Sequence, residues 1–228
     1  MTMKQNTDRI SIQVGLSGYS FRIEADTRTH SSEWMSSDRV FTTVEFQKRY
    51  DEVELAVFTP KFTLVPAQFC PPEDMRRLLS EVTSVGEDEQ VESVSVPEYN
   101  AVLLYSNSIG ESLSKVLAET VLRTDGSKAR PLPMIYYMLR RLEDIPEYNR
   151  ILAAYMDGVL YLIIAQGRTL LLCNSFRASD FTTAQYFIFL AMKKLQLNPE
   201  MSTLTFMTHL DEEQEMSVYR YFRSVEHI

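Results

Sequence analysis

Residues 151–210 carry the feature that most constrains the fold, a series of apolar segments separated by two-residue turns. The segments ILAAYM, VLYLIIAQ and TLLLCNSF are joined by the dipeptides DG and GR. Turns of this length and composition connect antiparallel strands, so they predict a three-stranded meander. An amphipathic helix that begins after Asp180 and a strand over residues 204–207 follow. This order of elements predicts a compact α/β unit.

Length and charge narrow the class of protein. The 228 residues leave room for one large domain or for two domains of about 100 residues each. The formal net charge is −8 and the sequence pI is about 5.0. An acidic chain of this kind is a poor ligand for a phosphate backbone or an anionic membrane, so no nucleic acid partner is expected.

The chain also lacks the signals of export, membrane insertion or metal binding. Its first 20 residues contain no signal-peptide core, and no apolar run approaches the roughly 20 residues that span a bilayer, so we expect a cytoplasmic location and no membrane insertion. Cys70 and Cys173 are too few for a disulfide framework and are expected to be reduced thiols. His30, His209 and His227 have no partners at ligand spacing, which predicts no metal site.

The N-terminal half begins with a predicted hairpin. Residues 10–14 and 19–25 flank a turn with the sequence GLSG, and in the second run apolar and polar residues alternate. Further strands are predicted over residues 39–46, 54–58, 61–66, 91–96 and 101–105, with a tight turn at Thr59-Pro60 between the second and third of these. Helices are predicted from Pro71 to near Gly86, after a capping box formed by Ser108 and Glu111, and over residues 133–142.

The last predicted element is a helix. Asp211 and Gln214 have the spacing of a capping box. Apolar residues then recur at the intervals of one helix face, at Val218, Tyr221, Phe222 and Val225. We therefore expect the chain to end on a helix with one buried stripe.

A faint internal repeat relates the two halves. A shift of 140 positions aligns the segment DGVLYLI, which begins at Asp157, with SGYSFRI, which begins at Ser17. The turn glycine and three apolar positions coincide, and both halves are predicted to run from a hairpin through further strands to a helix, a strand and a helix. This order predicts a duplicated unit, as in the actin-like ATPases, in which two ribonuclease-H-like subdomains hold a nucleotide between them.

Longer segments carry a specific resemblance. The run LLLCNSFRASDFTTAQYFIFLAMKKLQLNPEMSTLTFMTH, together with ISIQVGLSGYSFRI near the start, resembles an uncharacterised bacterial family, a domain of unknown function with an actin-like ATPase fold. The shared features are the strand end at Asn174-Ser-Phe176, Asp180 and Tyr186 of the next helix, the segment LNP, and a final helix rich in tyrosine. The resemblance implies duplicated actin-like subdomains with mixed sheets flanked by helices, which we place at residues 1–148 and 149–228.

The resemblance also indicates where a nucleotide would bind. In active actin-like ATPases an Asp precedes the first hairpin turn and organises Mg²⁺, and the backbone of the turn holds phosphates. Here Val14 stands in that place, before the candidate phosphate-binding residues Gly15, Ser17 and Gly18. Ser17 can donate one hydrogen bond, but its hydroxyl does not replace the missing charge.

The other two nucleotide signatures are altered as well. At the second hairpin turn the chain offers Asp157 and Gly158, but an Asp-Gly pair between apolar strands is foremost a type I′ turn. In the adenosine loop of an active member, glycines follow the strand, whereas here Met207-Thr-His209-Leu place side chains there. The sequence thus favours a pseudo-ATPase.

Three functions stay open at this stage, one of which is nucleotide sensing without turnover, which would need a cleft that binds nucleotide but lacks a water-activating carboxylate. The favoured one is a non-catalytic interaction or scaffold protein without a cofactor, with a protein partner that Tyr186 and Tyr219 are candidates to contact. The alternative is a divergent ATP-binding protein, ATPase or phosphotransferase, which would use ATP with Mg²⁺ at Gly15, Ser17, Gly18, Asp157 and Gly158. The sequence leaves the oligomeric state and the identity of a partner open.

Overall fold

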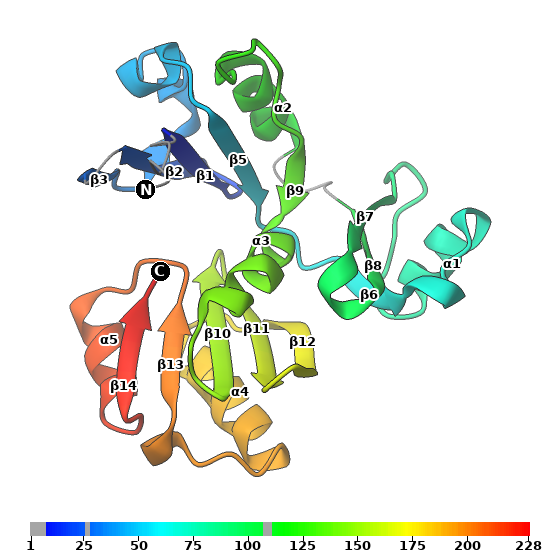
Figure 1. Ribbon diagram of the computed structural model, residues 1–228, viewed down its shortest axis with the longest axis vertical. Coiled ribbons are helices and arrows are strands. Elements are labelled where there is room, and N and C mark those ends of the chain that lie inside the picture. The colour runs from blue at the N-terminus through cyan, green and yellow to red at the C-terminus, as the bar shows by residue number, and fades with distance from the viewer. Residues whose placement is uncertain (1–7, 26–27, 107–110) are drawn as a thin grey trace, which may run out of the picture. The chain divides into compact units, whose positions relative to one another are not determined.

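The structure is a computed structural model that describes residues 8–25, 28–106 and 111–228. It contains strands and helices in alternation and divides into two compact units (Figure 1). The first unit comprises the described residues up to Lys61 together with Val85–Glu92 and Tyr105–Met134. The second comprises Phe62–Ser84, Ser93–Leu104 and Ile135–Ile228. The subdomain boundary expected between residues 148 and 149 stays a prediction.

The first unit is built on a sheet with the strand order β3-β2-β1-β5-β9, with β4 paired to β2. β1 is antiparallel to β2 and parallel to β5, and β5 is parallel to β9. On β1, alternate residues such as Ile10 and Ile12 are fully buried, as the period of a half-buried strand requires. The strands are β1 (Arg9–Val14), β2 (Gly18–Ala25), β3 (Arg28–Ser31), β4 (Met35–Ser36), β5 (Glu52–Val57) and β9 (Pro131–Pro133).

Short helical turns and one longer helix complete this unit. They are the 3-10 helices η1 (Ser37–Arg39) and η2 (Val44–Gln47) and the helix α2 (Glu111–Thr120). The strand predicted over residues 39–46 is wrong, because Phe46 turns into the core from η2 and packs on the rings of Tyr19 and Phe21. The predicted helix at α2 is confirmed, whereas Ser108 of its expected capping box lies outside the described residues.

The second unit repeats this strand pattern. Its main sheet has the order β12-β11-β10-β13-β14, in which β10 is antiparallel to β11, β11 is antiparallel to β12, and the pairs β10–β13 and β13–β14 are parallel. The predicted meander is therefore confirmed, and both sheets run 3-2-1-4-5 in local strand number. The strands are β10 (Asn149–Met156), β11 (Val159–Gln166), β12 (Thr169–Arg177), β13 (Thr203–Phe206) and β14 (Ser224–His227).

Two helices with well-formed N-caps connect these strands. The helix α4 (Phe181–Lys194) begins at Asp180, whose side chain accepts the backbone N–H of Thr183 at 2.7 Å. The helix α5 (Glu212–Tyr219) has the predicted capping box of Asp211 and Gln214. Both helices contribute to one core with the main sheet. The remaining elements here are α3 (Met134–Arg141), which the sequence predicted, and the 3-10 helices η6 (Leu142–Asp144) and η7 (Pro199–Met201).

The prediction that the chain ends on a helix is wrong. The helix α5 ends at Tyr219, residues 220–223 form a turn, and Ser224–His227 then form β14, which runs parallel to β13. Val225 is 8% exposed because it joins the core from this strand, while Tyr221 is 53% exposed. The apolar spacing that suggested one continuous helix face therefore comes from a helix, a turn and a strand.

A smaller sheet with the order β6-β8-β7 interrupts the first repeat. The strands predicted at 54–58 and 61–66 exist as β5 and β6, but they belong to different sheets and do not form a hairpin. Thr59 at their junction donates its hydroxyl to the carbonyl of Ser106 at 2.6 Å. This segment contains β6 (Phe62–Pro66), η3 (Ala67–Phe69), η4 (Pro72–Asp74), α1 (Met75–Ser80), β7 (Glu92–Val96), η5 (Pro97–Tyr99) and β8 (Ala101–Tyr105).

Candidate functional site

The first candidate turn joins β1 to β2. The backbone N–H of Gly15 donates to the carbonyl of Gly18 at 3.0 Å, which closes the turn on itself. Leu16 and Ser17 at its tip are exposed, while Gly15 and Gly18 are buried. Gly15, Ser17 and Gly18 thus lie together in one turn, where Ser17 is exposed and the backbone N–H of Gly15 is already used.

The packing of the first sheet by itself requires glycine at position 18. A Cβ atom there would lie 2.0 Å from the carbonyl oxygen of Met35 and 3.0 Å from the Trp34 indole nitrogen. Real Cβ atoms do not approach backbone oxygens so closely, and Met35 belongs to β4, which pairs with β2 beside Gly18. The close approach of β4 therefore requires glycine at this position whether or not the turn binds a ligand.

Val14 occupies the position that the resemblance assigns to an Asp in active ATPases. Its side chain has no exposed surface and belongs to the core of the first unit, together with Ile12, Leu55 and Val57. A fully buried hydrocarbon has no ligand atom for a metal ion or for water bound to one. The side chain before this turn is therefore part of the packing.

The second candidate turn joins β10 to β11. Met156 and Val159 are paired, so the loop contains only Asp157 and Gly158, whose φ angles are 51° and 72°. Positive φ at both central residues defines a type I′ turn, as the dipeptide predicted. The carbonyl of Gly158 accepts the backbone N–H of Ala178 at 2.8 Å. Asp157 is exposed. The turn between β1 and β2 is two residues longer than this turn, because its closing pair is Val14 and Tyr19.

The third candidate region, the segment after β13, carries side chains where an active ATPase has glycines. The hydroxyl of Thr208 accepts the backbone N–H of Tyr155 at 2.9 Å, and the N–H of Met207 donates to the carbonyl of Ala153 at 2.9 Å. Thr208 is buried, whereas His209 is exposed. The segment that would need bare backbone to accept a base is therefore tied to β10 by one side-chain and one backbone hydrogen bond.

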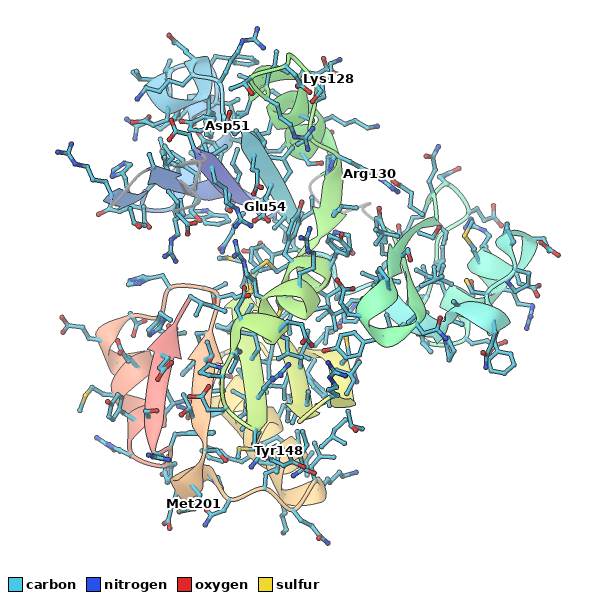
Figure 2. The ribbon with its side chains drawn as sticks, in the orientation of Figure 1. Asp51, Glu54, Lys128, Arg130, Tyr148 and Met201 are labelled. Atoms are coloured by element: carbon cyan, nitrogen blue, oxygen red, sulfur yellow. The ribbon has the colours of Figure 1, made fainter. Side chains whose placement is uncertain are left out.

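Two charged clusters were not singled out from the sequence. On β1 and β5, Arg9 donates to Glu54, which Figure 2 labels and which also accepts the Ser11 hydroxyl at 2.8 Å. These partners face each other only because β1 and β5, about 40 residues apart in the chain, pair in parallel register. Spacing within the sequence alone carries no signal for such a pair.

The second cluster lies beside β9. Arg130, which Figure 2 labels, donates to Glu92 at 2.7 Å and to the Tyr105 hydroxyl at 3.0 Å. Burial, and next the nearby Glu92 carboxylate, raise the pKa of Tyr105, so its hydroxyl stays protonated and can donate to Glu92 at 3.3 Å. The cluster ties the ends of β7 and β8 to the segment that precedes β9.

The described residues contain neither a metal site nor a membrane-spanning helix. Residues 8–25, 28–106 and 111–228 contain no group of three or more His, Cys, Asp or Glu side chains that could hold a metal ion. Within the same ranges, every helix is too short or too polar to cross a bilayer. Burial raises the pKa of the Cys173 thiol to about 12, which makes it a poor nucleophile.

The two repeated sheets define an actin-like ATPase fold. A protein from Bacteroides thetaiotaomicron with this fold and of unknown function aligns over 99% of this chain and 92% of its own, with a TM-score of 0.68 and 16% identity. The chain belongs to the DUF3822 family, which is described as 'protein of unknown function'. The model of this family matches residues 2–225. The resemblance stated from the sequence and the fold class that it implied are thus confirmed.

Two further solved structures are similar to this chain at lower identity. A chain of a PilM–PilN type IV pilus biogenesis complex aligns over 96% of this chain and 88% of its own, with 11% identity and a TM-score of 0.50. The cytoplasmic domain of EpsL, an inner membrane component of the type II secretion system of Vibrio cholerae, covers 90% and 83%, with 12% identity and a TM-score of 0.49. Comparison with curated proteins gave no match.

Proposed function

We propose that this protein is a non-catalytic interaction or scaffold protein whose actin-like fold has lost productive ATP hydrolysis. The observation that carries the proposal is the burial of Val14, which has no exposed surface. Active relatives of this fold need a carboxylate at that place to organise Mg²⁺. A valine side chain packed in the core of the first unit supplies neither charge nor a ligand oxygen.

The geometry of both turns supports the same proposal. The N–H of Gly15 donates within its own turn, so it is not presented to a phosphate. The turn at Asp157 and Gly158 has the type I′ backbone of an ordinary two-residue hairpin. Each turn is thus accounted for by the folding of its own hairpin.

A role in protein binding is supported by exposed aromatic side chains and by one structural relative. Tyr186 and Tyr219 are 60% and 50% exposed, and tyrosine is enriched in protein interfaces. A chain of the PilM–PilN complex has a similar fold, so the fold occurs in an assembly of two proteins. We propose a protein partner for this chain, with a location in the cytoplasm.

A second candidate function rests on the exposure of Asp157 and Ser17 at the two turns. Exposed oxygen atoms at these turns would allow a divergent ATP-binding protein to use Asp157 for Mg²⁺ and the turns for phosphates. This alternative needs both turns to act on one nucleotide.

Phosphate release from ATP by the purified full-length chain tests the proposal. With Mg²⁺ present, we expect wild type and Asp157→Asn to release phosphate at the same background rate, because neither has the carboxylate at position 14. The Asn variant is a suitable control because asparagine tolerates the left-handed backbone of this turn. Turnover by wild type that disappears in Asp157→Asn would overturn the proposal in favour of the ATPase.

A further inference from the structure

We propose that the free edge of β12 binds an extended segment of a partner protein, in which apolar residues alternate and a carboxylate lies near each end. This inference rests on the proposed interaction role and specifies the surface and the chemistry of the partner. The binding mode is the addition of a strand to an open sheet, in which backbone hydrogen bonds give affinity and side chains give selectivity.

The strand β12 is long, apolar and paired on one side only. It spans Thr169–Arg177, ends the strand order of its sheet, and pairs only with β11 among the described residues. Leu170, Leu172 and Phe176 are half-buried although they lie on an edge strand. Edges of this kind attract other strands, and proteins usually protect them with lysine, proline or a covering segment. The segment TLLLCNSF contains neither lysine nor proline; its features against strand addition are a bulge where Leu170 and Leu172 pair with Ala165 and Ile164, and the N–H of Ser175, which donates to the Asn174 side chain at 2.9 Å.

Aromatic rings extend the apolar surface on one side of this edge. Phe176 stacks on Phe187 of α4 with ring centroids 4.8 Å apart, and Phe187 contacts Tyr186 at 5.5 Å. Tyr186 at the end of this row is largely exposed. A strand added about 4.8 Å beyond β12 would place every second side chain on the face that carries these rings. This explains why the partner segment should have apolar residues at alternate positions.

The charges at the ends of β12 indicate the charge of the partner. Arg168 in the turn before the strand and Arg177 at its last position are both exposed, and neither forms an ion pair within residues 8–25, 28–106 and 111–228. They are nine residues apart, or about 30 Å along an extended strand. Guanidinium groups form their strongest hydrogen bonds with carboxylates. Tyr148, which Figure 2 labels, marks the end of β12 at which Arg168 lies. Its carbonyl accepts the N–H of Gly167, the residue before Arg168.

The same charges argue against a second copy of this chain as the occupant. In a full-length antiparallel pair of two β12 strands, Arg168 of one copy would face Arg177 of the other at both ends. Like charges directly opposite each other destabilise a strand pair. The two arginines therefore disfavour self-association of an apolar edge and favour a segment with acidic ends.

The test is selection of peptides of about ten residues from a random display library against the full-length protein, followed by anisotropy measurements with one labelled peptide that it enriches. We expect enriched peptides to combine alternating apolar residues with acidic ends, and to slow amide hydrogen exchange in residues 169–177. Arg168→Glu/Arg177→Glu should weaken binding of that peptide by about ten-fold or more, because attraction becomes repulsion at both ends. Arg220→Glu/Arg223→Glu makes the same charge change near β14, at the opposite end of the sheet, and should leave binding unchanged.

Three results would overturn the inference: no enriched peptide, equal binding to both double variants, or exchange protection outside β12. Sedimentation of wild type as a dimer, with amide protection confined to residues 169–177 in the absence of peptide, would assign the edge to a second copy instead. None of these results depends on nucleotide, so they leave the proposed loss of ATP hydrolysis to be judged by its own assay. Conversely, phosphate release that depends on Asp157 would overturn the proposed function and would not affect peptide binding at β12.

Discussion

At the scale of single residues, the candidate phosphate-binding glycines have roles in packing. Gly18 allows β4 to approach β2, and Gly158 takes a φ of 72° in a two-residue turn. Both requirements follow from the backbone around each glycine and from the absence of a Cβ atom. Gly18 and Gly158 are therefore explained without a ligand.

Replacement of Gly18 measures the first of these requirements. In Gly18→Ala the new methyl group would meet the Met35 carbonyl, so the backbone must shift, and we expect a loss of about 1–3 kcal/mol in the free energy of unfolding. Gly86→Ala is the matched control, because its Cβ would lie at an ordinary 3.5 Å from the Glu89 side chain and its φ is not positive. Denaturant unfolding should place the control within about 1 kcal/mol of wild type. Equal stability of the two variants would contradict this account of Gly18.

Asp157 allows the structural role of the second turn to be separated from any role of its charge. Asp157→Val places a β-branched residue at a φ of 51°, and we expect it to destabilise the protein by about 1–2 kcal/mol. Asp157→Asn keeps a residue that tolerates this backbone and should melt close to wild type. If Asp157→Asn were as unstable as Asp157→Val, the carboxylate and not the turn geometry would be the stabilising feature.

At the scale of elements, the sequence predicts best where the determinants are local. The type I′ turn, the cap at Asp180 and the capping box at Asp211 depend on residues within a few positions of each other, and all three are confirmed. The segment 39–46 alternates like a strand, but contacts of Phe46 with distant rings hold it in 3-10 turns. Tertiary packing here overrides the local pattern.

The sequence did not predict the C-terminal strand or the charged clusters, because these also depend on contacts between distant parts of the chain. Val225 is buried because β14 pairs with β13 some 20 residues earlier in the chain, which apolar spacing cannot distinguish from a helix face. Arg9 and Glu54 meet because β1 and β5 pair in parallel. Of the candidate site, the sequence predicts the position of both turns and the type of the turn at Asp157 and Gly158, whereas the burial of Val14 depends on the assembled core.

The N-cap of α4 gives a pH-dependent prediction at this scale. Hydrogen bonds from Thr183 hold the pKa of the Asp180 carboxyl below its ordinary value of 3.8, so the charged form stabilises the folded state. This contribution is present above about pH 4 and is lost as the pH falls through the lowered pKa. The melting temperature of wild type should therefore exceed that of Asp180→Ala at neutral pH, and the difference should shrink under acid. An Asp180 pKa at or above 3.8 by NMR titration would contradict it.

At the scale of the whole molecule, two sheets with one topology carry turns of unequal length. The local order 3-2-1-4-5 recurs in both, although the first repeat contains an inserted three-stranded sheet and, among its described residues, has only the short 3-10 helices η1 and η2 where the second repeat has α4. A fold with this duplication is shared by proteins of different function, so function depends on what the turns and edges retain. Here the turns retain their hairpin geometry, and β12 retains an apolar edge between two arginines.

The central claim is that the turns no longer form a nucleotide site, and a thermal-shift titration of the full chain with ATP and ADP, with and without Mg²⁺, tests it most directly. A ligand at about ten times its dissociation constant stabilises the native state by about 1.4 kcal/mol, so millimolar nucleotide reveals any affinity tighter than about 0.1 mM. We predict no shift in the melting temperature of wild type or of Asp157→Ala. A magnesium-dependent shift in wild type that Asp157→Ala abolishes would contradict the account and establish Asp157 as part of a working nucleotide site.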